Sequence, residues 1–351
     1  MDKVYVILVN YNRWEETLKC LESVLKTKYL HYQAIVVDND STNKSIQKIV
    51  DWSEGKQDLV LHDESHLIQY IKPSIPKPVH YVIINDSNQI PNRKKFSSDH
   101  LSTKLVIIKS NFNRGFSAGN NVGIRYALAR GDAKYFWLLN NDTVVSPESL
   151  SELVKQANKY ENLKKRIGII GAKLLDYKKP HLIQGVGGVY NKWIGTIKHT
   201  GMFEPDRGQY DNESTASKID YPIGASLFVS KEFIHDVGLM CEDYFLYFEE
   251  LDWTLRAKRD NWKIGFCWKA KIYHKRGATI GSKENEAQKD EIHDYYAKRN
   301  RLLITKKFYP KHQFSVLIVL FMIFLKRIIY RKNKNAKLIL KAIKDAYICE
   351  I

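Results

Sequence analysis

Three acidic side chains lie within four positions of the stretch YFLYFEELDW, residues 244–253. They are Glu249, Glu250 and Asp252, and the same ten residues hold five aromatic rings. A carboxylate among aromatic rings is costly to bury unless it is paired or hydrogen-bonded. Two interpretations are open: a solvated helix start, where acids are favourable, or a reaction site in which a carboxylate acts as a base.

Four further polar clusters follow segments that have the continuous apolar composition of buried parallel strands. The clusters are Val9, Asn10 and Tyr11; Asp38, Asn39 and Asp40; Asn111, Asn113, Arg114 and Gly115; and Asn140, Asn141 and Asp142. Ligands of open α/β sheets bind outside the carboxyl ends of the strands, so these clusters are expected to meet. Asn and Asp are also common in turns for local reasons, so one cluster alone indicates little.

The residue types in these clusters suit a nucleotide and a divalent cation. Asp38 can accept hydrogen bonds from a base or a ribose, and Arg114 can neutralise phosphate. Gly115 allows a backbone to approach closely. Asp142 and Asn140 offer hard oxygen ligands for Mg²⁺ or Mn²⁺. Neither the dinucleotide-binding glycine fingerprint nor the Walker lysine motif occurs in the expected context.

Apolar runs and helical periodicity predict the elements that position the clusters. Buried strands are predicted at residues 3–9, 33–40, 104–110 and 135–145, each followed by a helix. Ser117 is expected to cap the third of these helices, which ends at Gly131. The alternation predicts an α/β fold.

Later segments add short strands and longer helices to this pattern. From about residue 166, short strands with glycine turns precede a helix that starts at the acidic stretch. Residues 263–274 predict a bent strand or strand pair, and residues 285–308 a long helix. Residues 53–104 interrupt the pattern and are interpreted as an insertion with one strand-like piece at 79–85.

The composition is ordinary except for its charge. The 351 residues hold 56 Lys and Arg against 39 Asp and Glu, a net charge of +17. Such a surface attracts nucleic acid, acidic lipid headgroups or phosphorylated small molecules. The four cysteines show neither a CxxC pair nor metal-ligand spacing, which favours a reducing cytosol. The first residues predict a strand, not a signal peptide.

The longest apolar run is FSVLIVLFMIFL, residues 314–325, which a strongly basic segment follows. Twelve helical residues cover about 18 Å, short of a hydrocarbon core of roughly 30 Å. A full membrane span is therefore not expected. Two alternatives stay open: a buried core helix, or a helix in the interface of an anionic membrane.

Several motifs together resemble the family-2 glycosyltransferases, most closely their rhamnosyltransferase-like branch. They are VILVNYNRWEETLKCLESV, IVVDND, NFNRGFSAGNNVGIRYAL, FWLLNNDTVV and YFLYFEELDWTLRAKRDNWKI, in family order over about residues 3–280. The resemblance implies an α/β GT-A fold, with a central, mostly parallel sheet flanked by helices. It implies a catalytic domain at 1–280, with a nucleotide-binding half (1–145) and an acceptor half (146–280). Residues 281–351 would form a helical, basic C-terminal extension.

The resemblance also implies roles for individual residues. The implied nucleotide- and substrate-binding residues are Val9, Asn10, Tyr11, Asp38, Asp40, Arg114, Gly115, Asn120, Asn141, Asp252 and Trp253. NND takes the place of the family's metal-binding D-x-D, so Asn140 replaces the first acid and Asp142 is the principal ligand of Mg²⁺ or Mn²⁺. His274 is the implied second metal ligand. For Trp253 and Tyr247, sugar stacking and core packing are both open.

In the motif E-E-L-D the second acid is the family's general base, which makes Glu250 the implied base and Glu249 the fallback. The family's usual base is Asp, and Glu adds one methylene. The implied reaction is inverting transfer of a sugar from a dTDP- or UDP-sugar, with rhamnose as the branch's implication.

The implied acceptor is a glycan or lipid-linked molecule on the cytosolic face of the cell membrane, in cell-surface polysaccharide synthesis. Two alternative functions are a nucleic-acid-binding protein, suggested by the charge, and a sugar nucleotidyltransferase. The sequence carries no nucleic-acid recognition motif, so no nucleic-acid partner is expected. A processive synthase would need several spans and a Q-x-x-R-W motif, which the sequence lacks.

Overall fold

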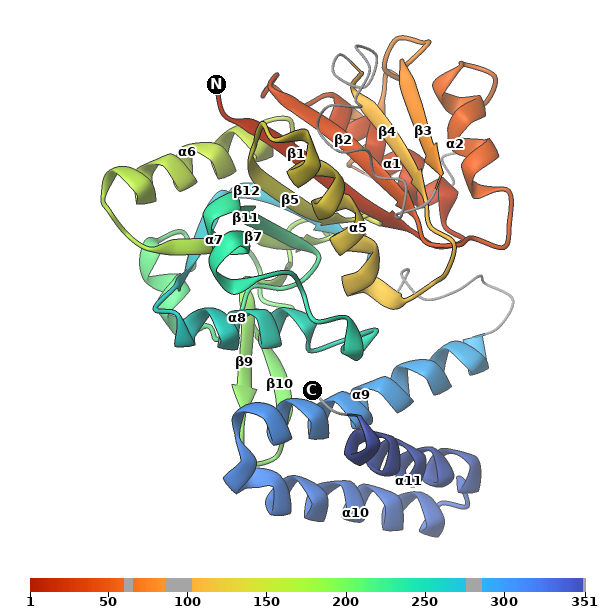
Figure 1. Ribbon diagram of the computed structural model, residues 1–351, viewed down its shortest axis with the longest axis vertical. Helices are drawn as coiled ribbons and strands as arrows, with labels where there is room; N and C mark the ends of the chain where they lie inside the picture. Colours follow the sequence, from red (N-terminus) through yellow and green to blue (C-terminus); the bar gives the residue numbers. More distant parts are fainter. Residues whose placement is uncertain (60–65, 86–102, 276–285, 350–351) are drawn as a thin grey trace.

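The computed structural model describes residues 1–59, 66–85, 103–275 and 286–349, in which strands and helices alternate (Figure 1). The strands are β1 (Lys3–Asn10), β2 (Tyr32–Asp38), β3 (Tyr81–Asn85), β4 (Leu105–Lys109), β5 (Ala133–Asn140), β6 (Thr143–Val145), β7 (Ile167–Asp176), β8 (Ile183–Gly185), β9 (Gly187–Asn191), β10 (Thr196–Thr200), β11 (Ser226–Ser230) and β12 (Lys263–His274). The α-helices are α1 (Trp14–Leu25), α2 (Ser45–Ser53), α3 (Ile68–Ile71), α5 (Gly115–Arg130), α6 (Ser149–Asn162), α7 (Lys231–Val237), α8 (Glu249–Arg259), α9 (Glu286–Phe308), α10 (Gln313–Ile329) and α11 (Asn333–Ile348).

One large sheet organises the molecule, with strand order β3-β4-β2-β1-β5-β11-β7-β12-β6 and β8 paired to β7. The five strands from β3 to β5 are parallel to one another. Strand β11 is antiparallel to both β5 and β7, and β6 is antiparallel to β12. The predicted mostly parallel α/β sheet is therefore confirmed, and the carboxyl ends of β1, β2, β4 and β5 share one edge.

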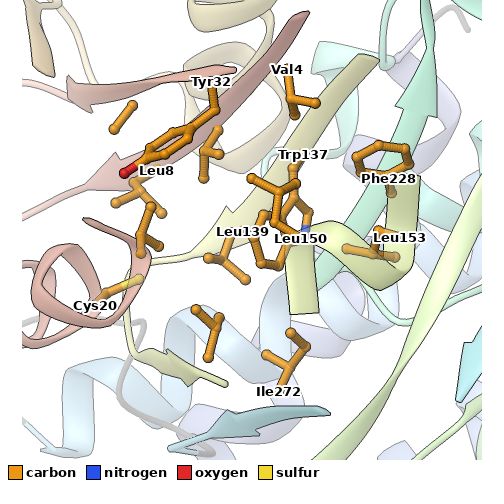
Figure 2. Close-up of a cluster of buried hydrophobic side chains, with 14 of the residues drawn as sticks. Val4, Leu8, Cys20, Tyr32, Trp137, Leu139, Leu150, Leu153, Phe228 and Ile272 are labelled. Atoms are coloured by element: carbon orange, nitrogen blue, oxygen red, sulfur yellow. The ribbon is translucent and has the colours of Figure 1, made fainter. Parts of the chain in front are cut away.

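Both faces of the sheet are covered by helices, which explains the continuous apolar composition of its strands. On one face Val4 and Leu8 of β1 pack with Leu150 and Leu153 of α6 (Figure 2). Alternate residues of β1, such as Ile7, pack against α5 on the other face. The register of β1 is thus fixed by burial on both sides.

The structure corrects one predicted helix start and settles the form of one strand. Helix α5 begins at Gly115, not beside Ser117, and Arg114 is its N-cap residue. Its end at Gly131, with φ of 79°, is as predicted. Residues 263–274 form one strand whose register shifts between Cys267 and Lys271, so the bent-strand alternative is confirmed.

The described part of the predicted insertion contributes helix α3 and the edge strand β3. Residues 60–65 and 86–102, in the rest of that segment, lie outside the described residues, as does the predicted domain boundary at 280. The division into domains therefore stays a prediction.

Helices α9, α10 and α11 lie together at one end of the molecule, beyond α8 and the two-stranded β9–β10 ribbon (Figure 1). The apolar run is not a core helix, because only Val316 and Leu320 of α10 are buried. The expectation that it is too short to span was wrong on length. With the preceding turn, the helix covers 20 residues, Pro310–Ile329, with a mean hydropathy of 1.8. Among the described residues it is the one helix long and apolar enough to cross a membrane, by length and composition alone.

Candidate active site

The three predicted metal ligands meet at the carboxyl edge of the sheet. Asn140 ends β5, Asp142 lies in the turn that leads into β6, and His274 ends β12 opposite Thr143 of β6. Nε2 of His274 lies 3.1 Å from Oδ1 of Asp142 and 3.4 Å from Nδ2 of Asn140. Residues 134 positions apart in sequence therefore face one point.

Gln184 fixes the orientation of the His274 ring. Its amide nitrogen donates to the backbone carbonyl of His274 at 3.2 Å, and its amide oxygen lies 2.6 Å from Nδ1 of the ring. A carbonyl can only accept, so the amide must present its oxygen to the ring, and Nδ1 must carry a hydrogen. In the neutral imidazole the lone pair is then on Nε2, the atom that faces Asp142. Such a partner orients a metal-bound histidine.

The residues at this point fit a divalent cation. Oδ1 of Asn140 is buried and has no hydrogen-bond partner among the described residues. A carboxylate, an amide oxygen and an imidazole nitrogen are donors that Mn²⁺ or Mg²⁺ accepts. Within the described ranges, no three His, Cys, Asp or Glu side chains form a metal cluster. The fit therefore needs the amide of Asn140, together with donor phosphates and water.

The acidic stretch begins helix α8, but its carboxylates are not solvated. Glu249 is 5% exposed, and Asp252 is fully buried. Glu250 is partly exposed, and its Oε2 atom is shielded from solvent without a hydrogen-bond partner in the described parts of the chain. The solvated-helix interpretation is therefore wrong, and Glu250 is the acid of the pair that lies nearer the surface.

Glu250 lies against the same sheet edge as the metal ligands. The backbone N–H of Gly224 donates to the Glu250 carboxylate, and a Cβ on Gly224 would stand 3.3 Å from its Oε1. The next residue, Ala225, accepts a hydrogen bond from the backbone N–H of Asn140 at 3.0 Å. The adjacent residues Gly224 and Ala225 thus connect the predicted base Glu250 with the predicted metal ligand Asn140. Phe116 of α5 borders the space beside Gly224.

Burial sets the protonation of the two glutamates. Desolvation raises the pKa of Glu249 well above its ordinary value, and the neighbouring charge of Glu250 raises it further. Desolvation also raises the pKa of Glu250, and the N–H groups of Glu250 and Gly224 offset part of that rise. Two adjacent carboxyls that both resist ionisation favour one proton on the pair. The hydrogen bond from Gly224 favours the charge on Glu250, which is the form a base needs.

The first two strand ends form a hydrogen-bonded loop, not an open row of polar groups. Asn10 donates to Oδ1 of Asp38 at 2.6 Å, and the two residues are register partners of β1 and β2. The other oxygen of Asp38 accepts from the backbone N–H of Ser41 at 3.1 Å. Asp38 is 1% exposed, so it shapes the loop, while the neighbouring Asp40 is exposed. Val9 and Tyr11 are partly exposed at the same edge.

The start of α5 joins this loop to the acidic stretch. Asn39 donates to the backbone carbonyl of Gly115 at 3.1 Å. The N–H of Phe116 donates to the carbonyl of Phe245 at 2.9 Å. A Cβ on Gly115, whose φ is 89°, would stand 2.2 Å from that carbonyl, so only glycine fits. Beside it the Arg114 side chain is 70% exposed and lies 3.8 Å from Glu242, available to an anionic ligand.

Two predicted binding residues, Asn120 and Asn141, make hydrogen bonds inside the fold. Asn120 is buried and donates to the backbone carbonyl of Phe116 in its own helix. Asn141 is buried and donates to Thr17. Their short polar side chains are used inside the fold. We therefore omit both from the proposed site.

Asp252 and Trp253 are structural residues, which corrects their predicted roles. Asp252 accepts from Arg256 at 2.7 Å and pairs with Lys307 of α9 at 2.7 Å. Trp253 is fully buried, and its indole N–H donates to the carbonyl of Gly238 at 2.9 Å. A buried carboxylate needs such partners, and a ring without an exposed face cannot stack on a sugar.

Asn300 of α9 holds the loop that precedes Glu249, a role that no sequence motif indicates. Its amide nitrogen lies 2.8, 2.6 and 3.1 Å from the backbone carbonyl oxygens of Tyr244, Leu246 and Tyr247, so its two hydrogens are shared among three acceptors. In that loop Phe245, Tyr247 and Phe248 all have positive φ. Non-glycine residues adopt this conformation only where the surroundings impose it. A fully buried side chain of the C-terminal helices therefore positions the acidic stretch.

Replacing Asn300 with alanine is expected to lower turnover by about 10- to 100-fold, because the loop that aims Glu250 loses its hydrogen bonds to this amide and misplacement of a catalytic group is costly. Steady-state kinetics on the folded fraction measures the effect. Thr305→Val is the matched control, because Thr305 is also fully buried on α9 but bonds to Tyr190 and its own helix. Equal turnover in the two variants would show that Asn300 has no positioning role.

The mostly parallel sheet flanked by helices has the architecture of the GT-A class of nucleotide-sugar-dependent enzymes. The cation-fitting cluster and the buried carboxylate pair lie at its carboxyl edge. The chain belongs to one family of that class: the model of "Glycosyl transferase family 2" matches residues 5–71 and 65–219. The predicted family and GT-A fold are confirmed.

Two curated relatives and one solved structure illustrate the similarity. The chain is 26% identical over 235 residues to the low-salt glycan biosynthesis hexosyltransferase Agl10 of Haloferax volcanii, covering 66% of this chain and 68% of the relative. It is 26% identical over 267 residues to the dTDP-rhamnosyl transferase RfbF of Shigella flexneri, covering 73% and 80%. The S. aureus TarS 1-349 structure in complex with UDP-GlcNAc matches with a TM-score of 0.50, 14% identity, and 98% and 80% coverage. This last likeness bears on the fold alone. The resemblance to rhamnosyltransferases is thus confirmed.

Proposed function

We propose that the chain is an inverting glycosyltransferase that moves a hexose from a nucleotide-diphosphate-sugar to a hydroxyl group of a glycan or lipid-linked acceptor. The single observation that supports this most is the placement of Glu250 beside Gly224. The next residue, Ala225, is hydrogen-bonded to Asn140, and Asn140 meets Asp142 and His274 at one point. The family and the names of the curated relatives support sugar transfer in glycan synthesis. They do not favour the nucleic-acid-binding or nucleotidyltransferase alternatives.

In the proposed reaction, Glu250 takes the proton of the acceptor hydroxyl as that oxygen attacks the anomeric carbon. The new carbon–oxygen bond forms on the face opposite the leaving diphosphate, so the configuration inverts. The bond from the anomeric carbon to the diphosphate breaks, and its electron pair leaves with the diphosphate. Arg114 stabilises this growing charge from the start of α5.

A divalent cation, Mg²⁺ or Mn²⁺, would be held by Asp142 and His274 with the amide of Asn140, and would supply charge stabilisation at the diphosphate. Val9, Tyr11 and the loop closed by Asp38 form the proposed nucleoside side of the site. Val9 and Tyr11 are partly exposed at the end of β1, where ligands of such sheets bind.

A donor screen tests the proposal. Nucleotide release is measured with a panel of nucleotide-sugars in the presence of Mg²⁺ or Mn²⁺, and dTDP-rhamnose is the first candidate because RfbF bears that activity in its name. We expect turnover of one donor to exceed that of the others, and the product of transfer to have the inverted anomeric configuration by NMR. Retention of configuration would refute the assigned mechanism.

We propose that the acceptor is presented at the inner face of the cell membrane, with the enzyme peripheral and otherwise cytoplasmic. The exposed apolar α10 and the basic charge around it support this. Deleting residues 311–351 would be a poor test. Leu302 and Leu303 of α9 share a core cluster with Val316 and Leu320, so the deletion would also disturb the helix that holds the catalytic loop.

A further inference from the structure

Helix α10 presents an apolar stripe to solvent. Seven large side chains on it are between 43% and 77% exposed: Phe314, Ile318, Phe321, Met322, Leu325, Ile328 and Ile329. At about 100° per residue these positions fall within an arc of roughly 120°. The buried Val316 and Leu320 lie on the opposite side of the helix. A contiguous apolar surface of this kind marks an interaction site.

The turn of the β9–β10 ribbon extends this surface from a different part of the chain. Trp193 is 62% and Ile194 39% exposed. Ser315 of α10 donates to the backbone carbonyl of Trp193 at 2.6 Å, and the indole ring lies 4.3 Å from the ring of His312. A Cβ on Gly195, two residues after Trp193, would stand 2.6 Å from the side chain of Arg301. The turn is therefore fixed beside the first turn of α10.

Positive charge surrounds the stripe. Residues 310–349 hold nine Lys and Arg and one Asp. Lys192 and Lys311 are exposed at the Trp193 end, and Lys326, Arg331 and Lys332 are exposed at the other end. Apolar side chains with tryptophan at the edge and lysine around them are the composition of a helix in the interface of an anionic bilayer.

Two other roles for the stripe are disfavoured. The packing of α10 argues against a transmembrane helix, and the charge around it argues against an interface with a second copy. Arg327 makes two hydrogen bonds to Asp294 of α9, at 2.6 and 2.7 Å, and α11 packs on the same side of α10. A helix that spanned a bilayer would have to carry these charged helices with it, so the packing favours a helix that lies on a membrane over one that crosses it. A second copy of the chain would bring the same basic rims together across a self-complementary interface, with like charges opposed.

We propose that α10 and the β9–β10 turn form one docking surface that seats the enzyme on an anionic bilayer, with α10 in the plane of the interface. The hairpin turn is the new element, because it belongs to the residues ahead of the acidic stretch and ties the catalytic part of the chain directly to the membrane. The inference uses the proposed function only for the location of the acceptor, and the docking itself does not require transfer.

Sedimentation with vesicles tests the surface. Full-length protein is mixed with vesicles of phosphatidylcholine and phosphatidylglycerol, and with vesicles of phosphatidylcholine alone, at low and high salt. We expect binding to the anionic vesicles that salt weakens. Met322→Glu should lower the affinity about tenfold or more, and Trp193→Ser severalfold, because each removes buried apolar area. Leu30→Glu, at a 70% exposed site beside the N-terminus, should bind like the unmodified protein.

Three outcomes would overturn the inference. Unchanged binding of Trp193→Ser would remove the hairpin turn from the surface. Resistance of the bound protein to alkaline carbonate extraction would indicate a spanning helix. Loss of self-association in Met322→Glu by analytical ultracentrifugation, without vesicle binding by the unmodified protein, would assign the stripe to a second copy. Donor hydrolysis by the same variants should stay unchanged, so failure of docking is distinguishable from failure of the proposed transferase.

Discussion

Replacing Glu250 with glutamine is expected to lower turnover about 10²–10⁴-fold, the range that a positioned general base contributes. Glutamine keeps the oxygen that accepts from the N–H of Gly224 but cannot take the proton of the acceptor. The helix and the metal cluster should therefore be unaffected, and donor binding should survive. Steady-state kinetics gives the loss of turnover, and calorimetric titration with the nucleoside diphosphate gives donor affinity.

The pH profile adds a second signature of the base. Burial raises the pKa of Glu250, so its ionised form is lost at a higher pH than that of an exposed glutamate. Turnover should fall as the pH drops through that raised pKa, and the residual turnover of Glu250→Gln should not show this fall. A flat profile in the unmodified enzyme would contradict the assignment.

Two control variants separate the possible bases. Glu249→Gln should cost less, because Glu249 is the more deeply buried acid and carries the shared proton in the proposed scheme. Asp260→Asn, at an exposed acid that follows α8, should be neutral. Near-normal turnover of Glu250→Gln with a large loss in Glu249→Gln would assign the base to Glu249.

Much of the fold could be predicted because its signals are local. Parallel strands buried on both faces give continuous apolar runs, so β1, β2, β4 and β5 were found with their polar carboxyl ends. Because ligands of such sheets bind at those ends, the sequence alone predicts that Asp38, Arg114 and Asp142 lie along one edge. The start of α5 was misplaced, because a close backbone contact with Phe245, 130 residues away, decides the conformation at Gly115.

The remaining site features depend on contacts that carry no spacing signal. Gln184 orients His274 from the short strand β8, and Asn300 holds the acidic stretch from α9. Both are polar residues in segments that the sequence describes only as strand or helix. The burial of Asp252 and Trp253 could not be predicted either, because both share a motif with Glu250. In the structure they face the interior. Asp252 pairs there with Arg256 and Lys307, and Trp253 donates to the carbonyl of Gly238.

Asp142→Asn is expected to lower turnover by about 10²–10³-fold. Asn140 replaces the first acid of the metal motif, so Asp142 is the single carboxylate of the three converging residues. The substitution keeps the shape of the side chain and removes the one carboxylate that these three residues supply. A bound cation contributes several kcal/mol of charge stabilisation, which corresponds to this loss of rate. Turnover with Mg²⁺ or Mn²⁺ gives the rate, and Mn²⁺ titration by electron paramagnetic resonance, with the nucleoside diphosphate present, gives the affinity.

The control for Asp142→Asn is Asp176→Asn, one strand away. Asp176, on β7, is the register partner of His274, on β12. Its carboxylate accepts hydrogen bonds from the backbone N–H groups of Lys178 and Lys179, a role that asparagine can also fill. It should bind Mn²⁺ and turn over like the unmodified enzyme. If transfer continued undiminished in excess chelator, or if Asp142→Asn bound Mn²⁺ normally, the contact between Asp142 and His274 would be a structural ion pair. The charge on the leaving diphosphate would then have to be met by Arg114, the exposed cation at the start of α5.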